Sequence, residues 1–305
     1  MNCAVIDIRG VTRHFGGVRA VDGVDLSIRA GEMFGLIGHN GAGKTTLFKL
    51  MLGLIEPTAG EISILGEPVR GRAFRDVRKH IGFMPETVAL YGNLSGLETL
   101  RFFAKLKGAP RTSCGALLER VGLGAAVARP VRQYSKGMLQ RLVFAQALLG
   151  APRILFLDEP THGLDPAGVC ELYGMLHEIQ ERGATVVLTS HILAEVGQRV
   201  DRLALMNNGT IQATGTVQAM RDALDLPIGF EVRLRGGADA ALRAALQPLA
   251  VGEVEIDDAR ASFRCARSIK LAALAALSGL GDQLLDINVQ EPSLEDVFMS
   301  YRGAH

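Results

Sequence analysis

Tryptophan is absent from this chain of 305 residues, and cysteine is rare. The four cysteines, Cys3, Cys114, Cys170 and Cys265, stand far apart, without CxxC pairs or the dense spacing of a disulfide-stapled secreted domain. No stretch approaches the roughly 20 apolar residues that a membrane-spanning helix requires. The N-terminal sequence MNCAVIDIRG contains neither a basic leader nor the apolar segment of a secretory signal. We therefore expect a reduced, cytoplasmic protein.

An excess of charge of either sign is also missing. Lys and Arg total 33, and Asp and Glu total 32, so the overall charge gives no general attraction to nucleic acid. We expect no nucleic-acid partner. Apolar residues, in contrast, make up 48% of the sequence, which is enough for a sizeable core. The length suits one ordinary domain plus a smaller one.

Short apolar segments alternate with helical patterns over the first two thirds of the chain. Strands are predicted at residues 4–8, 24–28, 33–37, 154–157, 184–189 and 202–206, and helices at about 168–182 and 192–199. Residues 95–150 have mostly helical patterns. Alternating strands and helices predict an α/β fold in which helices cover a mainly parallel sheet.

A change of pattern follows at residues 222–230, where DALDLPIGF carries a Pro and a Gly after a helix. Beyond it we predict strand 228–235, helix 238–249, strands 251–257 and 260–266, helix 268–278, strand 284–290 and a last helix. Ser293 is expected to cap that helix, with Asp296 in its first turn. This order of elements is the ferredoxin-like one. We predict two domains, residues 1–221 and an α+β domain at 228–305.

The segment GHNGAGKTT, residues 38–46, fits the phosphate-loop pattern G-x-x-x-x-G-K-[ST] between an expected strand and an expected helix. Glycines let backbone N–H groups approach phosphate oxygens, and the helix N-terminus adds its dipole. Lys44 supplies a charge for the β- and γ-phosphates, and the Thr45 hydroxyl is a ligand for Mg²⁺. The sequence therefore predicts a site for ATP and Mg²⁺. Its loop comprises Gly38, His39, Asn40, Gly41, Ala42, Gly43, Lys44, Thr45 and Thr46.

Two adjacent acids end a second apolar segment, ILFLDEP at residues 154–160. A buried strand that ends in Asp158 brings a carboxylate to the carboxyl edge of the sheet, where the phosphate loop also lies. Asp158 is predicted to hold Mg²⁺ through water, and Glu159 to polarise the attacking water. We therefore expect an enzyme that hydrolyses ATP to ADP and phosphate. Many nucleotide-binding families share these two elements, so they leave the family open.

A third motif discriminates between those families. YSKGMLQRLVFAQALLG, residues 134–150, resembles the LSGGQ signature of ATP-binding-cassette (ABC) ATPases followed by its helix. Ser135 and Gly137 match the positions that contact the γ-phosphate bound by the partner subunit, whereas Lys136 and Met138 depart from the usual Gly and Gln. The resemblance thus implies a homodimer that sandwiches two nucleotides.

Further motifs of this sequence resemble those of ABC ATPases and follow in the same order along the chain. The resemblance implies that Phe15 stacks on adenine, that residues 161–165 form the D-loop, and that His191 is the switch histidine beside the γ-phosphate and Glu159. In IGFMPE, Glu86 stands where the family usually has Gln, on a loop that reaches both Mg²⁺ and the membrane subunit. A carboxylate is a hard oxygen ligand, so metal binding by Glu86 is retained.

The ABC resemblance covers residues 1 to about 218. It implies a core with a RecA-like parallel sheet, an antiparallel β subdomain, and a helical signature subdomain at about residues 95–150. It also implies that the chain powers transport through a separate permease.

A narrower resemblance rests on His39, the Glu86 loop, the Lys-Gly-Met signature at 136–138 and the closing PSLEDVF. Together they look like the ATPase subunit of the transporter that matures nitrous-oxide reductase. That family works with a polytopic permease and a periplasmic partner protein in assembling copper centres of the reductase. It implies a peripheral position on the inner face of the cell membrane. Cys, His and Met do not cluster at ligand spacing here, so we expect this subunit to supply only energy.

Other interpretations stay open. Export-type ABC ATPases for drugs, lipids or polysaccharides also end in SLEDVF. Soluble ABC proteins that act on ribosomes or DNA usually carry two cassettes or a long coiled-coil insertion, and this sequence has neither. The C-terminal domain is expected either to sense a small molecule or metal, or to form a dimerisation or docking surface.

Overall fold

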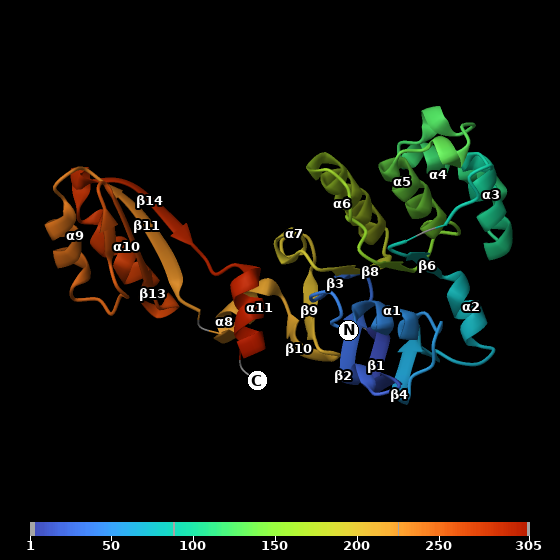
Figure 1. The fold of residues 1–305 in the computed structure, drawn as a ribbon, viewed down its shortest axis with the longest axis horizontal. Helices are drawn as coiled ribbons and strands as arrows, with labels where there is room; N and C mark the ends of the chain where they lie inside the picture. The colour runs from blue at the N-terminus through green and yellow to red at the C-terminus, as the bar shows by residue number, and fades with distance from the viewer. Residues whose placement is uncertain (1–3, 88, 225, 304–305) are drawn as a thin grey trace. The chain divides into compact units, whose positions relative to one another are not determined.

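The computed structural model describes residues 4–87, 89–224 and 226–303 (Figure 1). The chain divides into two compact units, Met1–Gly215 and Thr216–His305, each with its own hydrophobic core. The division falls earlier than the sequence predicted. Helix α8 (Val217–Leu224), which we expected in the first domain, belongs to the second unit because it contacts α11 (Leu294–Gly303) and Asp222 pairs with Arg267 at 3.2 Å.

A six-stranded sheet forms the centre of the first unit. Its order is β10-β9-β3-β8-β7-β6, and all neighbouring pairs are parallel except β9 and β10. The strands are β3 (Met33–Ile37), β6 (Ile81–Met84), β7 (Ile154–Leu157), β8 (Thr185–Ser190), β9 (Arg202–Asn207) and β10 (Thr210–Gly215). Every residue of β3, β7 and β8 is buried, as expected for parallel strands covered on both faces.

An antiparallel sheet lies below the central sheet in Figure 1, in the order β2-β1-β4-β5. Its strands are β1 (Ala4–Phe15), β2 (Val18–Arg29), β4 (Ala59–Ile64) and β5 (Glu67–Pro68). The first two are longer than predicted. The pairing of β1 with β2 is irregular beyond Ile8, where the register shifts several times. In this region side chains accept hydrogen bonds from backbone N–H groups: Gly10 N donates to Asp25 at 2.8 Å, and Gly23 N donates to Thr12 at 3.0 Å.

Helices cover the central sheet on both faces (Figure 1). Helix α1 (Lys44–Met51) separates the two sheets, and its Phe48 packs edge-on against Phe156 of β7 at 5.3 Å. The other helices of this unit are α2 (Phe74–Lys79), α3 (Gly96–Lys107), α4 (Cys114–Arg120), α5 (Lys136–Ala147), α6 (Pro166–Glu181) and α7 (Leu193–Val196), with 3₁₀ turns at Arg111–Ser113, Gly124–Ala126 and Val131–Gln133.

Helix α7 is shorter than the expected 192–199. The chain leaves the helix after Val196 so that Asp201 can accept a hydrogen bond from the Met33 N–H at 2.8 Å, which aligns β9 with β3. None of the described helices is long and apolar enough to cross a membrane. Cys3 lies outside the described residues; of the other cysteines, Cys114 and Cys265 are buried and Cys170 is exposed, all as free thiols.

The second unit has the predicted ferredoxin-like topology. Its four strands are all antiparallel to their neighbours, in the order β12-β13-β11-β14. The elements are β11 (Ile228–Leu234), α9 (Asp239–Leu246), β12 (Glu255–Asp257), β13 (Arg260–Cys265), α10 (Lys270–Ser278) and β14 (Leu284–Gln290), with 3₁₀ turns at Arg267–Ile269 and Gly281–Gln283.

Two local details of this unit refine the prediction. Strand β12 begins later than residue 251, where Val251 makes only an isolated bridge to Cys265. Ser293 caps α11 as expected: its hydroxyl accepts from the Asp296 N–H at 3.1 Å, and the Asp296 carboxylate accepts from the Ser293 N–H at 2.9 Å.

Candidate active site

The loop between β3 and α1 is built so closely against its neighbours that two of its positions need glycine. A Cβ at Gly38 would run into the carbonyl of Met206, and a Cβ at Gly43 into that of Ala20. Gly43 also has φ = 105°, in the left-handed region that favours glycine. The first turn of α1 therefore opens directly onto this loop, with backbone N–H groups available for an anion.

The Lys44 side chain is fixed by hydrogen bonds to the carbonyls of the loop. It is buried, and its ammonium donates to the carbonyls of Gly38 at 2.7 Å and His39 at 3.2 Å. Its Nζ also lies 3.5 Å from Oε1 of Glu159. The Lys44 ammonium thus interacts both with its own loop and with Glu159, which lies 115 residues further along the chain. A bound phosphate would compete with these oxygen atoms for the ammonium.

A cavity of about 470 Å³ opens beside this loop. Its lining comprises Val18, Arg19, Ala20, Asn40, Gly41, Ala42, Gly43, Lys44, Thr45, Thr46, Glu86, Glu159, His162, His191 and Asn208. Most of the phosphate loop predicted from the sequence thus surrounds one space, together with Glu86, Glu159 and His191.

Asp158, at the end of β7, lies against the same cluster. Its Oδ1 accepts a hydrogen bond from Thr189 at 2.6 Å and one from Thr45 at 3.5 Å. Burial raises the pKa of this carboxyl, the hydrogen bonds from Thr189 and Thr45 oppose that rise, and the charges of Glu159 and Glu86 add to it. A divalent cation would relieve this accumulation of negative charge.

The oxygen atoms of Thr45 and Asp158, with Glu86 on the same cavity, suit a hard cation such as Mg²⁺. Over the described ranges, no three His, Cys, Asp or Glu residues converge to hold a metal by themselves. Any such ion would therefore take its remaining ligands from phosphate and water.

Glu159 adopts an unusual backbone conformation, with φ = 50° for a non-glycine residue. Its N–H donates to the Thr189 hydroxyl at 2.9 Å, and its Oε2 lies 2.8 Å from Nδ1 of His191. The side chain is 8% exposed. Thr189 therefore orients both acids at once, and His191 fixes the carboxylate of the second.

Six predicted residues lie outside the lining of this cavity: Gly38 and Asp158, which border it, and Phe15, His39, Ser135 and Gly137. Ser135 caps α5, where its hydroxyl accepts from the Met138 N–H at 3.2 Å, and Gly137 follows in the same helix. The His39 ring turns to the Asn207 side chain at 2.9 Å. Phe15 ends β1, 47% exposed, beneath the Arg13 guanidinium at 4.6 Å from its ring centroid.

Among the residues that sequence reasoning did not assign to this site, two contact its carboxylates. His162 lines the cavity, and its Nδ1 lies 3.4 Å from Oε1 of Glu86. Thr189 bonds both Asp158 and Glu159. His162 stands inside the D-loop at residues 161–165, and Thr189 lies two residues before His191, but nothing local distinguished either residue from its neighbours.

A smaller hollow of about 270 Å³ shares Glu86, Glu159 and His162 with this cavity and extends to Lys136 and Gln140 of α5. The Gln140 amide donates to the Pro160 carbonyl, and the Lys136 ammonium covers the Cα of Gly163. The start of the signature helix is thus attached to the turn that follows the two acids.

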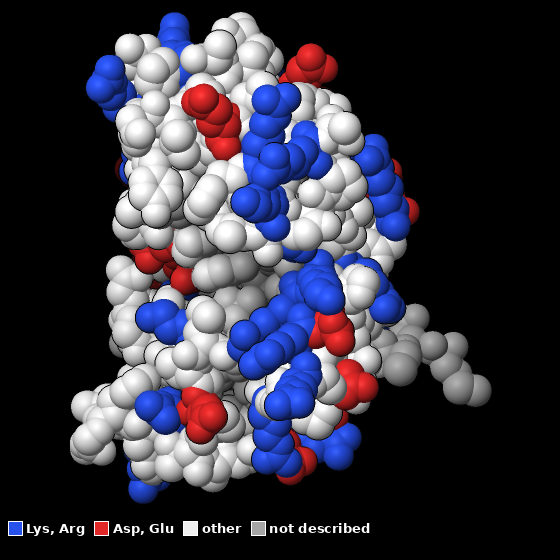
Figure 2. All heavy atoms as spheres, turned by 90° about the vertical axis from the view of Figure 1, so that its right-hand side faces the viewer, with Lys and Arg blue, Asp and Glu red and all other residues white. Residues whose placement is uncertain are grey.

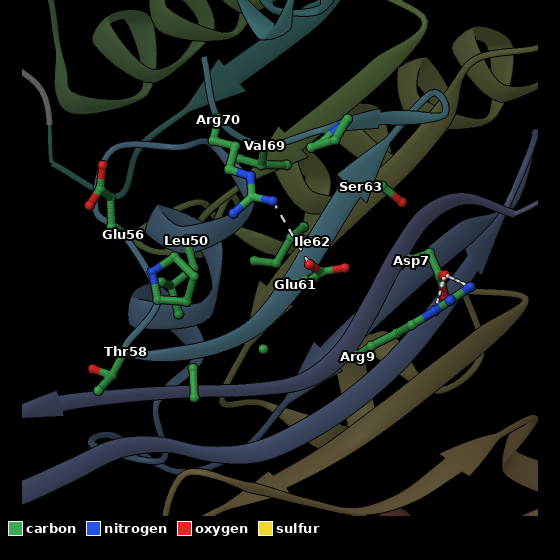
Figure 3. Close-up of a pocket in the computed structure, with 14 residues that line it drawn as sticks. Asp7, Arg9, Leu50, Glu56, Thr58, Glu61, Ile62, Ser63, Val69 and Arg70 are labelled. Atoms are coloured by element: carbon green, nitrogen blue, oxygen red, sulfur yellow. Dashed lines mark hydrogen bonds and ion pairs between the residues drawn. The ribbon is translucent and has the colours of Figure 1, made fainter.

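A larger hollow, of about 610 Å³, lies elsewhere, between β1, β4, β5 and the end of α1 (Figure 3). Four of its charged side chains form ion pairs: Arg9 with Asp7 at 2.7 Å and Arg70 with Glu61 at 3.9 Å. It contains none of the predicted site residues. The residues that line a hollow, rather than its volume, therefore identify the active site.

Known proteins resemble the chain along its whole length. Residues 21–162 match the ABC transporter family. The chain is 36% identical to the daunorubicin resistance ATP-binding protein DrrA3 of Streptomyces coeruleorubidus, over 98% of this chain and 96% of that protein. It is 32% identical to the bacitracin transport ATP-binding protein BcrA of Bacillus licheniformis, over 98% of this chain and 97% of that one.

Solved structures agree with this likeness. An ATP-binding subunit of an ABC transporter superposes with a TM-score of 0.66 at 31% identity, over 72% of this chain and 92% of that chain. A dimeric ATP-binding cassette in a post-hydrolysis state, bound to ADP and phosphate, gives 0.64 at 25% identity, over 70% of this chain and 98% of that chain. The phosphate loop, the two acids and the sheet that joins them therefore correspond to those of ABC nucleotide-binding domains. The chain belongs to the ABC transporter family, as an ATP-binding subunit whose ATP hydrolysis is coupled to transport.

Proposed function

We propose that two copies of this chain close on two ATP molecules and drive a separate polytopic permease in the cell membrane. One observation carries the dimer: Ser135 and Gly137 lie outside the cavity that gathers Lys44, Glu159 and His191. A γ-phosphate bound there therefore needs a signature motif from another molecule, and a two-fold pair supplies one to each site. The similar cassette that was solved as a dimer supports the same arrangement.

Each residue of the cavity has a proposed task in hydrolysis. Lys44 exchanges its loop carbonyls for the β- and γ-phosphates. Thr45, Asp158 and Glu86 hold Mg²⁺, which neutralises phosphate charge when it is bound. Glu159 orients and polarises the attacking water, and His191 keeps that carboxylate in place.

The nucleotide base has a proposed platform in Phe15. Its exposed ring can stack on adenine, and the Arg13 guanidinium already lies against it. The polar residues Arg19 and Asn208 line the nucleotide cavity together with the phosphate loop.

The permease-facing surface is proposed to include the Glu86 loop and the region from Tyr91 to about Lys107. Tyr91, Phe102 and Leu106 are 61%, 39% and 68% exposed, and the Tyr91 and Phe102 rings touch at 5.9 Å. Exposed apolar clusters of this kind mark sites for a protein partner. Glu86 lines the nucleotide cavity and stands five residues before Tyr91 in the sequence, which supports a coupling of docking to hydrolysis.

A position on the inner face of the membrane is supported by charge. Residues 70–80 contain five Lys or Arg and one Asp, and residues 101–111 contain four Lys or Arg and no acid. Figure 2 shows Lys and Arg gathered in a band on one face. Anionic headgroups attract such a band by about 1 kcal/mol per basic residue near the surface.

Co-expression tests the transporter assignment. Expressed with the permease encoded beside it, the protein should purify from detergent as a complex that contains two copies of this chain. A soluble protein that co-purifies with no membrane protein would contradict the assignment.

For the pathway served, we propose maturation of the copper centres of nitrous-oxide reductase, together with a periplasmic accessory protein that acts through the permease. The support is His39, Glu86, the Lys-Gly-Met signature and the closing PSLEDVF. A second candidate is export of a drug or another amphiphile. It is favoured by the daunorubicin and bacitracin relatives, whose likeness covers 98% of this chain, the second unit included.

Gene disruption separates the two pathways. If the first is correct, the disrupted strain makes reductase protein that lacks its catalytic copper–sulfur centre, and a plasmid copy restores the centre while a Glu159→Gln copy does not. A fully metallated reductase together with increased drug sensitivity would favour export and leave the ABC assignment untouched.

The second unit is proposed as a dimerisation or docking surface rather than a ligand sensor. The open face of its sheet carries polar side chains of both signs, among them Glu231, Arg233, Arg260 and Asp286, around a hollow of about 530 Å³. Mixed charges suit a protein partner better than a single small ligand.

A further inference from the structure

Three carboxylates border the nucleotide cavity and its adjoining hollow before any phosphate enters. Glu86, Glu159 and Asp158 line these two spaces, together with the basic side chains of Arg19, Lys44 and Lys136. Asp158 is satisfied by two hydroxyls, and Glu159 by Lys44 and His191. Glu86 contacts the imidazole of His162, with Nδ1 and Oε1 3.4 Å apart.

His162 is well placed to act on Glu86. It follows β7 in the turn after the two acids, where its N–H donates to the Glu159 carbonyl at 3.1 Å. Its ring lies edge-on to the His191 ring, with the centroids 6.5 Å apart. His162 lines both the nucleotide cavity and the adjoining hollow, and so does Glu86. The turn thus fixes the imidazole between the Glu86 loop and the catalytic pair.

We propose that His162 is a positioning residue that, when no Mg²⁺ is bound, holds the Glu86 carboxylate and keeps its charge away from the terminal phosphate of ATP. Nδ1 of His162 lies 3.4 Å from Oε1 of Glu86, so the imidazole can direct an N–H at this carboxylate when Nδ1 carries a proton. The two side chains are 55% and 46% exposed, so the pair contributes little to folding. Its effect is local and depends on what else occupies the cavity.

This role predicts a difference between ATP and ADP. Without His162, the Glu86 carboxylate is free to approach the phosphate chain, and ATP carries more negative charge there than ADP. We expect His162→Ala to raise the ratio of the dissociation constants for ATP and ADP about three- to fivefold. The effect requires Glu86, so His162→Ala in a Glu86→Gln background should leave that ratio unchanged.

The experiment is competition of ATP and of ADP against a fluorescent ATP analogue, in EDTA, with the full-length protein. His162→Asn should retain most of the wild-type ratio because its amide also donates an N–H. His177→Ala, an exposed histidine on α6, is the matched control. Thermal unfolding without nucleotide identifies any variant that fails to fold, and the Asn variant then carries the comparison with Glu86→Gln.

The ratio of the dissociation constants for ATP and ADP in the two backgrounds decides whether His162 acts through Glu86. An ATP-selective loss in His162→Ala that disappears in the Glu86→Gln background supports the proposal. Equal losses for ATP and ADP, or the same loss in both backgrounds, would overturn it, because His162 would then act on the cavity without acting through Glu86.

Discussion

Replacing Glu159 by Gln is the most direct perturbation of the proposed chemistry. The substitution keeps the size of the side chain and removes its charge. In the structure this carboxylate is 8% exposed and lies 2.8 Å from His191 and 3.5 Å from Lys44. Both neighbours can still contact an amide oxygen, so the cavity keeps its shape while the base is lost.

The expected loss follows from that geometry. A positioned general base contributes about 10²–10⁴-fold to rate, so turnover should fall by this factor, about 3–5 kcal/mol of barrier. ATP should bind at least as tightly as in the wild type, because one buried negative charge has left the neighbourhood of the phosphates. The variant should therefore accumulate as an ATP-bound dimer.

Two measurements check this expectation: phosphate release under saturating MgATP, and the apparent mass on size exclusion with and without ATP. Glu67→Gln, an exposed acid on β5 outside both nucleotide-site hollows, serves as the matched control. Turnover of the Glu159 variant within about threefold of wild type would refute its assignment as the base, against the 10²-fold minimum expected. Loss of ATP binding would instead assign Glu159 to affinity.

Three further predictions concern binding, domain structure and stability. Lys44→Ala should abolish the thermal stabilisation by MgATP, which is worth about 2.7 kcal/mol at 100 times the dissociation constant; a wild-type rise in Tm would exclude Lys44 as the phosphate lysine. A fragment that ends at Gly215 should stay folded and bind nucleotide, because the second unit has its own core, while dimerisation or coupling to the permease suffers; an unfolded fragment would contradict this division. Lys107→Met should raise Tm, because burial lowers the pKa of Lys107 to about 8 and its charge opposes folding. Between pH 8 and 10.5 the unfolded wild-type chain keeps a proton on Lys107 that the folded chain has lost, so the free energy of unfolding of the wild type should rise toward that of the variant as the pH rises through this window. Below pH 8 the difference in stability between the two proteins should be constant. Equal Tm values at pH 7 would contradict the burial of this ammonium.

Much of the fold could be predicted from the sequence because its signals are local. Apolar runs such as 33–37 and 154–157 became the buried strands β3 and β7, and their parallel pairing through β8 confirmed the α/β class. The ferredoxin-like order of the second unit was also predicted correctly, since β11 and β13 show a period of two and Ser293 marks the last helix.

The limits of the elements were harder to predict. The ends of β1 and β2 carry polar residues and glycines, and their pairing depends on the partner strand and on hydrogen bonds that Thr12 and Asp25 accept from backbone N–H groups. Likewise, α8 has the pattern of an ordinary amphipathic helix, and only its contact with α11 assigns it to the second unit.

By itself, the sequence determined the presence of a phosphate loop, two acids after a buried strand, and the order of the motifs, because each is a short pattern whose chemistry follows from residue type and spacing. Tertiary structure decided which side chains meet. Thr189 bonds Asp158 across 31 residues, His162 reaches Glu86 from another strand end, and Ser135 lies apart from the cavity of its own chain. These relations depend on strand order and on the path of each connecting loop, and no local pattern encodes the distance between two strand ends that only the folded sheet brings together.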